Sequence, residues 1–594
     1  SLHDALPILT ISNTTVTITQ SSELSASGSC SNGQIVVNVD KTAEPEGLVT
    51  LNLEGLTLSN SSVAPIYVEA IGDEMQISAK SGTTNTISDG TTHTDTYVDS
   101  DGNTNTVNGA IFSRNDLKLK GKGTLNVNGN YEDGIVCKND LKLWNGTIVV
   151  HAVDDGIRGK DSVRIGDPTA TDYSNLKVTV HTNNGTSGGD GIKSTNDTDE
   201  NSGYVTINGG TVSIQSYSDG IQAEQAFTMN GGDVTIETYS GHTFTGSASG
   251  GNSGNPWGGG MGGGGMDGNA NKTDISAKGI KAVGLYSDEA KTTYVSGGDI
   301  TINGGTLNID SSDDSLHCAG TMQILGGDLK LASADDGIHS DTDVIIGSES
   351  DATNYTSPSV DISYSYEGVE GVTVTMNSGS VMVYSTDDGF NAAGGADSSG
   401  NSNPGGWGQG GWGGGSSSSS NDYKLTFNGG YTYVNAAGDG LDSNGDMFIN
   451  GGYIFVSQTG GGNGPLDCGD NNNSINYTGG VLVAGGSSDM FETPSSYSFL
   501  TSSSLAAGST VTFTDSNGTV LATMTFANSS SKMVMSAPEN SVTCYTGGTL
   551  SGTTYFPSST SDANRSVVCG YGGTISGGTT VSASSGGGGG GWNW

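Results

Sequence analysis

Aspartates followed by a turn residue recur along this sequence and are the residues best suited to chemistry. The fullest copy, residues 154–158, reads Asp-Asp-Gly-Ile-Arg and joins carboxylates, a turn residue, an apolar residue and a cation. Related copies carry Asp133, Asp190, Asp219, Asp313-Asp314, Asp335-Asp336, Asp387-Asp388 and Asp439. Carboxylates suit calcium, and cations suit a carboxylate-bearing ligand. The motif therefore indicates a site for ions or for charged ligands.

The spacing of the copies indicates one repeated structural unit. Asp133 and Asp155 are 22 residues apart, and so are Asp314 and Asp336. A period of about 20–50 residues is typical of solenoids and propellers. Between the aspartates, Gly-Gly is followed by alternating apolar and polar residues, which predicts a strand with one buried face; examples are residues 209–214, 231–236, 304–309 and 326–331.

One Asp-Gly alone would indicate an ordinary hairpin turn. Many copies at this period, each followed by a strand, instead predict an all-β protein, a right-handed parallel β-helix (solenoid) with a small C-terminal β-module. Propeller signatures are absent from the sequence. We expect a non-native leader at residues 1–8, N-terminal capping coils at 9–110, the parallel β-helix at 111–491, the small module at 500–580 and a Gly-rich tail at 581–594.

Glycine- and tryptophan-rich inserts at residues 246–268 and 394–420 interrupt the predicted helix. Such compositions behave as tethers, and self-association through these segments is the alternative. Six cysteines are present. Cys137, Cys318 and Cys468 fall at the same inward phase of the repeat, which predicts buried thiols, whereas Cys544 and Cys569 are candidates for a disulfide.

Charge excludes one class of partner. The chain of 594 residues has 62 acidic and 21 basic residues and a net charge of −41. Nucleic acid is therefore not expected as a partner, because its binding needs a basic face. No apolar run is long enough to predict a transmembrane segment. The acidity fits either a solubilising surface or a surface that carries cations.

Stacking would bring the aspartates close together. Equivalent residues of successive coils lie about 4.8 Å apart, where two unit charges repel by about 0.9 kcal/mol in water and by roughly 3–4 kcal/mol at an effective dielectric near 20. Such a ladder needs protons, neighbouring cations or bound metal. The residue after the apolar position supplies cations in several copies: Arg158, Lys193, Lys281, His317 and His339. The two histidines are expected on the surface.

Calcium is the metal that fits, because it takes about 6–8 oxygen ligands. The predicted calcium ligands are Asp133, Asp154, Asp155, Asp190, Asp219, Asp313, Asp314, Asp335 and Asp336. The alternative is that these are turn aspartates that bond their own backbone. For the later ladder, around Asp314 and Asp336, the two interpretations stand level.

Residues 128–135, 138–141, 154–163 and 189–197 closely resemble a bacterial carbohydrate-binding β-helix family, the clostridial polygalacturonate- and cellulose-binding type. The resemblance covers about residues 9–550. It implies a secreted, calcium-binding, right-handed parallel β-helix, similar in fold to calcium-dependent pectate lyases. The Gly/Trp-rich inserts depart from this pattern, and the copy at Asp439 lacks the paired aspartate.

Together these observations predict non-catalytic, calcium-dependent binding of an acidic plant cell-wall polysaccharide of the polygalacturonate or pectin type, with cellulose as another ligand. The protein is expected outside the cell or at its surface, with an N-terminus that looks truncated and shows no signal peptide. Candidate substrate-binding residues are Lys138, Arg158, Lys160 and Lys193. The alternatives are a polysaccharide (pectate) lyase, with one of these cations as the base, and an extracellular adhesin or structural spacer.

Overall fold

The computed structural model describes residues 9–12, 14–99, 101–244, 276–287, 293–393, 423–469, 473–556 and 569–584. The predicted leader at 1–8, both Gly/Trp-rich inserts and the end of the predicted tail, from 585 on, lie outside these ranges. The protein is nearly all β, as predicted, with 3₁₀ turns η1 (Gly241–Thr243) and η2 (Glu349–Asp351). No described helix is long and apolar enough to span a membrane.

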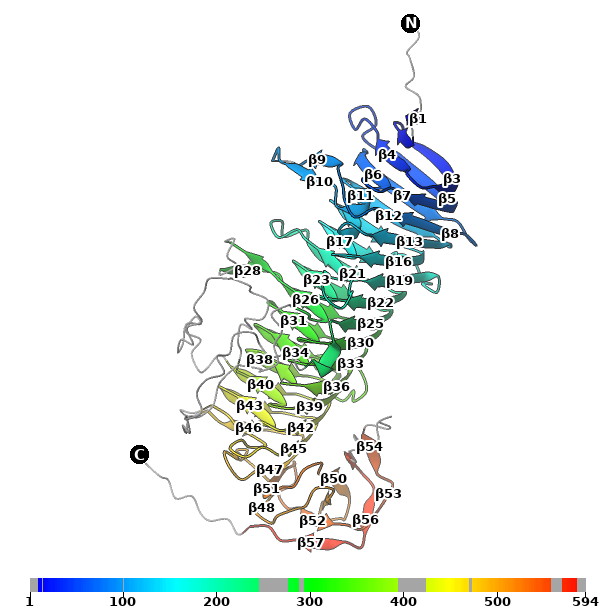
Figure 1. The fold of residues 1–594 in the computed structure, drawn as a ribbon. Coiled ribbons are helices and arrows are strands. Elements are labelled where there is room, and N and C mark those ends of the chain that lie inside the picture. Colours follow the sequence, from blue (N-terminus) through cyan, green and yellow to red (C-terminus); the bar gives the residue numbers. More distant parts are fainter. Residues whose placement is uncertain are drawn as a thin grey trace. The chain divides into compact units, whose positions relative to one another are not determined.

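The chain divides near residue 335 into two units, each of which consists largely of stacked parallel strands (Figure 1). In the first unit, β14 (Asp133–Cys137), β15 (Asp140–Leu143) and β16 (Gly146–Ala152) form one repeat. They pair in parallel with β17 (Ile157–Gly159), β18 (Ser162–Ile165) and β19 (Leu176–His181) of the next. Each strand thus meets its own counterpart, and the repeats form three columns.

The first column of this unit carries the aspartate motif. Its strands are β11 (Gly109–Ser113), β14, β17, β20 (Ile192–Ser194), β23 (Ile221–Ala223), β26 (Ile280–Ala282) and β31 (Leu316–Cys318). Upstream, β2 (Thr15–Ile18), β4 (Gln34–Asn38) and β6 (Ile66–Ala70) continue the same column without the motif. Antiparallel β1 (Leu9–Ser12) lies at the start of the column.

Apolar stacking holds this column together. Ile135, Ile157, Ile192, Ile221 and Ile280 are aligned one above another, and each is fully buried. Burying such a side chain stabilises the fold by about 1.5–3 kcal/mol. The stack also fixes the register, because a slip of one residue would turn every isoleucine toward the solvent side.

The second unit repeats this arrangement. Its motif column consists of β34 (Ile338–Ser340), β37 (Val369–Glu370), β40 (Phe390–Ala392) and β43 (Leu441–Ser443), all parallel. In another column, β45 (Tyr453–Gln458) pairs in parallel with β47 (Val481–Gly486), which then meets β51 (Lys532–Ser536) antiparallel. Parallel stacking of that column therefore ends at β47.

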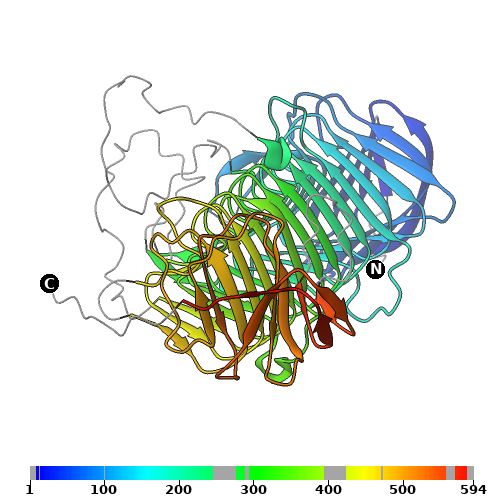
Figure 2. The ribbon, with the colours of Figure 1, turned by 90° about the horizontal axis from the view of Figure 1, so that it is seen from below.

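Antiparallel strands follow in the same unit, including β49 (Thr510–Thr514), β50 (Val520–Thr525), β52 (Thr543–Thr546) and β55 (Cys569–Tyr571). Figure 2 shows these orange and red strands beside the yellow strands of their unit. Tyr431, Tyr433 and Phe455 form a shared core with Phe513 and Met524 of these strands. The antiparallel strands thus cover the face on which these parallel strands carry aromatic side chains.

The cysteines are all free. Cys137, Cys318 and Cys468 are buried, as predicted. The candidate disulfide between Cys544 and Cys569 is wrong. In their sheet, β52 carries Cys544 and β55 carries Cys569, and strands β49 and β50 lie between them.

Close stacking explains the glycine of the motif and makes a testable prediction. A Cβ on Gly156 would lie 2.6 Å from the Gly191 carbonyl oxygen and 2.2 Å from Val180 Cγ1. We expect Gly156→Ala to lower the free energy of unfolding by about 1–3 kcal/mol, because the core is overpacked. Gly461→Ala, where nothing lies within 4 Å of the added Cβ, is the matched control. Thermal unfolding of both variants tests this, and equal midpoints would contradict it.

Candidate functional site

The motif aspartates of the first unit form a hydrogen-bonded ladder. Oδ1 of Asp133 accepts the backbone N–H of Asp155 at 3.1 Å, and Oδ1 of Asp155 accepts that of Asp190 at 2.9 Å. In the same way, Oδ1 of Asp190 accepts the N–H of Asp219 at 3.0 Å, and Oδ1 of Asp219 accepts the N–H of Lys278 at 2.9 Å. Each carboxylate thus bonds the backbone of the next repeat, which differs from an aspartate that bonds its own turn.

The second oxygen of these carboxylates faces a cation. Arg158 Nη2 lies 2.5 Å from Asp133 Oδ2, and Lys193 Nζ lies 2.7 Å from Asp190 Oδ2. Lys281 Nζ lies 3.5 Å from Asp219 Oδ2. The strand register aligns Arg158 with Lys193, one residue beyond the stacked isoleucines. The cations predicted to bind substrate therefore also neutralise the ladder.

Burial is the largest influence on the pKa values of Asp133 and Asp190 in this ladder. It raises the pKa of Asp190 to about 7, although the charge of Lys193 opposes the shift. It also raises the pKa of Asp133, opposed by Arg158. Burial alone would lower the pKa of Lys193, but the Asp190 and Asp155 carboxylates outweigh burial and raise it. The cations are needed because the aspartates are buried.

The remaining predicted residues of this region are differently placed. Asp154 is largely exposed; partial desolvation of its carboxyl group and repulsion from Asp155 raise its pKa. Lys160 is exposed and forms no ion pair with any residue that the structure describes. Lys138 Nζ lies 5.6 Å from the ring centre of Tyr97, and burial, aided by Arg158, lowers its pKa to about 8.

The later aspartates converge more closely. Asp313, Asp314 and Asp335 each bring one carboxylate oxygen within 4.8 Å of the others, and all are buried. Buried Lys278 places Nζ 3.2 Å from Asp313 Oδ2 and 2.5 Å from Asp314 Oδ2. An all-oxygen set of this kind suits calcium. Within the described ranges, no three of the first-ladder aspartates converge in this way.

Sequence reasoning missed Lys278. Residues 278–280 read Lys-Gly-Ile, which is the Asp-Gly-Ile motif with a lysine in place of the aspartate. The N–H of Lys278 takes the ladder position after Asp219, and its ammonium group reaches the next acidic pair. The substitution within the motif was the signal that could have identified it.

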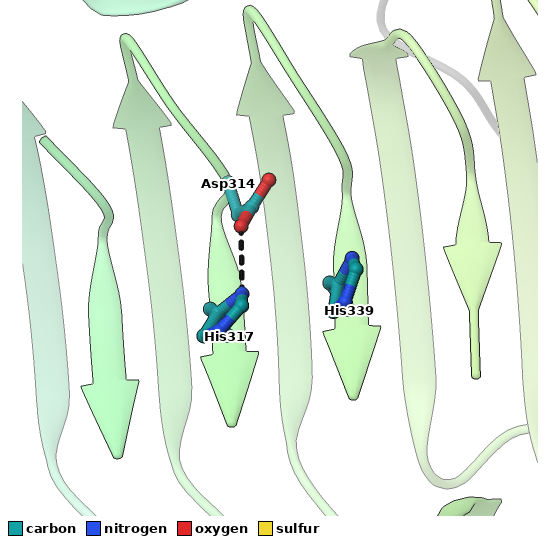
Figure 3. A group of neighbouring side chains, drawn as sticks. All are labelled: Asp314, His317 and His339. Atoms are coloured by element: carbon teal, nitrogen blue, oxygen red, sulfur yellow. Dashed lines mark hydrogen bonds and ion pairs between the residues drawn. The ribbon is translucent and has the colours of Figure 1, made fainter. Parts of the chain in front are cut away.

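The expectation that His317 and His339 lie on the surface is wrong, since both are buried. Nδ1 of His317 on β31 lies 2.9 Å from Asp314 Oδ2, as Figure 3 shows. In the second unit, Nδ1 of His339 lies 3.1 Å from Asp336 Oδ2 and 2.8 Å from Glu370 Oε2. Burial would lower the pKa of His339, but attraction to Glu370 and hydrogen bonds to Asp336, Asp341 and Glu370 together outweigh burial and raise the pKa well above its usual value.

Comparison with known proteins identifies the family. A family model described as carbohydrate-binding domain-containing protein matches residues 12–337 and 320–402, more than half of the chain. The chain therefore belongs to this family of carbohydrate-binding domain proteins.

Individual relatives match smaller parts. A carbohydrate-binding domain-containing protein of Acetivibrio thermocellus is 35% identical over 144 residues, which are 24% of this chain and 47% of that protein. The chain thus spans about half the length of this relative. A solved structure of a polysaccharide lyase-like protein from C. thermocellum, a gadolinium derivative, is 31% identical, covers 40% of this chain and 86% of that one, and has a TM-score of 0.34.

The buried ion pair makes a prediction about stability. Arg158→Leu leaves the fully buried Asp133 without its cation, and we expect a loss of about 3 kcal/mol or more in the free energy of unfolding at neutral pH. Adding Asp133→Asn, which keeps an oxygen for the N–H of Asp155, should recover most of that loss. Chemical denaturation of the single and double variants measures the coupling. Additive effects would contradict it.

Proposed function

We propose that this protein binds acidic plant cell-wall polysaccharide of the polygalacturonate or pectin type, without catalysis and with calcium, outside the cell or at its surface. The chain is proposed to wind as a right-handed parallel β-helix, the hand that parallel crossovers almost always take. The observation that carries the proposal is the aligned column of cations, Arg158 and Lys193, on repeats of a carbohydrate-binding family protein. Cellulose remains the alternative ligand.

The cations beside the aspartate ladder support an acidic ligand. Successive cations one repeat apart match a polymer that carries a carboxylate on each sugar, and arginine offers a planar fork for such a group. Lys160, which is exposed and forms no described ion pair, is the most accessible of the four predicted binding cations. Arg158 and Lys193 would share their charge between the ladder and the polysaccharide.

Calcium fits the converging carboxylates. Asp313, Asp314 and Asp335 would hold the ion through oxygens within 4.8 Å of one another, with Lys278 offsetting part of their charge. A bound calcium ion would supply positive charge for the uronate carboxylates. Asp133, Asp155 and Asp190 would then serve mainly to orient their cations, because each already bonds the next repeat.

Binding experiments test this proposal. We expect affinity electrophoresis to show retardation by polygalacturonate that falls on removal of calcium and on methyl-esterification of the polymer, because both remove the charge pairing. Lys160→Ala should lower the affinity for polygalacturonate by about tenfold, because one charged contact is lost. Lys177→Ala on β19, an equal charge change at an exposed site, is the control. Binding unchanged by chelator and by esterification would contradict the proposal, and no binding to any glycan would favour the adhesin or spacer.

A lyase is the second candidate, and one observation favours it. β-Elimination needs a base that takes the proton beside the uronate carboxyl while the bond to the next sugar breaks and a double bond forms. Lys138 has a pKa lowered to about 8 by burial and by Arg158. A lysine of this kind is partly neutral near neutral pH and can accept a proton.

The lyase candidate predicts a specific pH profile. Because the neutral amine is the base, formation of unsaturated product from polygalacturonate should rise as the pH increases through about 8, the pKa of Lys138. Lys138→Met should abolish the reaction, while Lys177→Ala should leave it unchanged. Ultraviolet absorbance of the unsaturated ends measures it. Absence of product across this pH range would exclude the lyase.

A further inference from the structure

Beyond His339, the motif column of the second unit has acidic or amide residues at the position where most repeats of the first unit have cations. This position is held by Arg158, Lys193, Gln222 and Lys281 in the first unit and by His339, Glu370, Asn391 and Asp442 in the second. Two lysines of the second unit fall within its described ranges. Lys424 forms no ion pair there, and Lys532 donates to the Phe491 carbonyl. Lysine and arginine therefore do not neutralise this part of the column.

The aspartate ladder nevertheless continues here. Oδ1 of Asp388 accepts the N–H of Asp439 at 2.5 Å, and Oδ1 of Asp439 accepts the N–H of Gly464 at 2.5 Å. Asp388, Asp439 and Asp442 each bring one carboxylate oxygen within 4.8 Å of the others. Three carboxylates thus converge at a point where no cation of the described chain is paired with them.

A buried amide provides an independent indication of a ligand. Asn391 is 5% exposed, and its Nδ2 donates to Glu367 Oε2 of the preceding repeat at 2.9 Å. The other end of the amide, Oδ1, is buried and has no hydrogen-bond partner. Since Nδ2 is directed to the preceding repeat, Oδ1 is turned toward the following one, where Asp442 is the aligned residue. A buried carbonyl oxygen without a donor is costly unless something binds it.

We propose that Asp388, Asp439 and Asp442, together with Oδ1 of Asn391, bind a calcium ion that replaces the lysines and arginines of the first unit. The donors are all oxygens, which disfavours zinc because zinc prefers nitrogen and sulfur ligands. Calcium tolerates irregular geometry and completes its shell of about 6–8 oxygens with water or backbone carbonyls, whereas magnesium demands a near-ideal octahedron. The two units would thus neutralise their motif columns by different means, side-chain cations in the first unit and a metal ion in the second.

The site is consistent with the electrostatics of its residues. Burial and the Asp439 carboxylate raise the pKa of Asp388 to about 9, and burial and the same neighbour raise that of Asp442 to about 7. Ligating carboxylates must be ionised, so calcium binding at this site is expected to weaken as the pH falls.

Calcium titration of the full-length chain, without glycan, tests the proposal. After chelator treatment, isothermal titration with calcium chloride at pH 7.5 gives the number and affinity of sites. We expect Asp442→Asn and Asn391→Leu each to remove one calcium per chain or to weaken that site by about tenfold or more. Glu349→Gln, an exposed residue of the same unit, should match the parent chain.

Folding of the variants is measured in the same samples. In the absence of calcium, Asp442→Asn should melt at or above the temperature of the parent chain, because it removes a like charge from the cluster, and it should lose part of the melting-temperature rise that calcium causes. Unchanged calcium number and affinity in both variants would overturn the proposal, as would a parent chain that binds no calcium at pH 7.5. Since no glycan is present, failure here is distinct from failure of the polysaccharide-binding proposal.

Discussion

In-register stacking is the constraint on which this structure depends. When every repeat places its residues above their own counterparts, like meets like along the whole column. For isoleucine this is favourable, since Ile135, Ile157 and Ile192 bury one another completely. For aspartate it is unfavourable, because buried carboxylates at that spacing repel. The chemistry of the aspartate ladder follows from how this repulsion between carboxylates is offset.

The first remedy is geometric. Each carboxylate gives one oxygen to the N–H of the next repeat, as Asp133 does to Asp155 and Asp155 does to Asp190. The second remedy is charge, supplied by Arg158 and Lys193 on the adjacent strand residue. A buried ion pair adds little net stability, but removing one partner is costly. The acidic ladder and its cations therefore depend on each other, and any ligand must be compatible with both.

Local substitutions within the motif change the means of neutralisation. Lys278 replaces an aspartate of the ladder and places its ammonium group against Asp313 and Asp314. In the second unit, Glu367 replaces an aspartate and Glu370 replaces the cation, and His339 lies against Glu370 and Asp336. The same backbone positions thus carry ion pairs in one repeat and converging acids in another. Repeats of this kind can therefore differ in charge while their strands keep the same pairing.

The sequence by itself determined the all-β fold, the alignment of the motif copies and the burial of Cys137, Cys318 and Cys468, because a repeated pattern specifies its own register. It did not reveal that His317 is buried, that Cys544 and Cys569 are on strands separated by two others, or that Lys278 reaches Asp313. Those depend on which side chains of different repeats meet, and on how deeply they are covered. Spacing along the chain places residues in a column, but the distances between side-chain atoms, which decide between an ion pair and a metal site, arise only when the repeats pack.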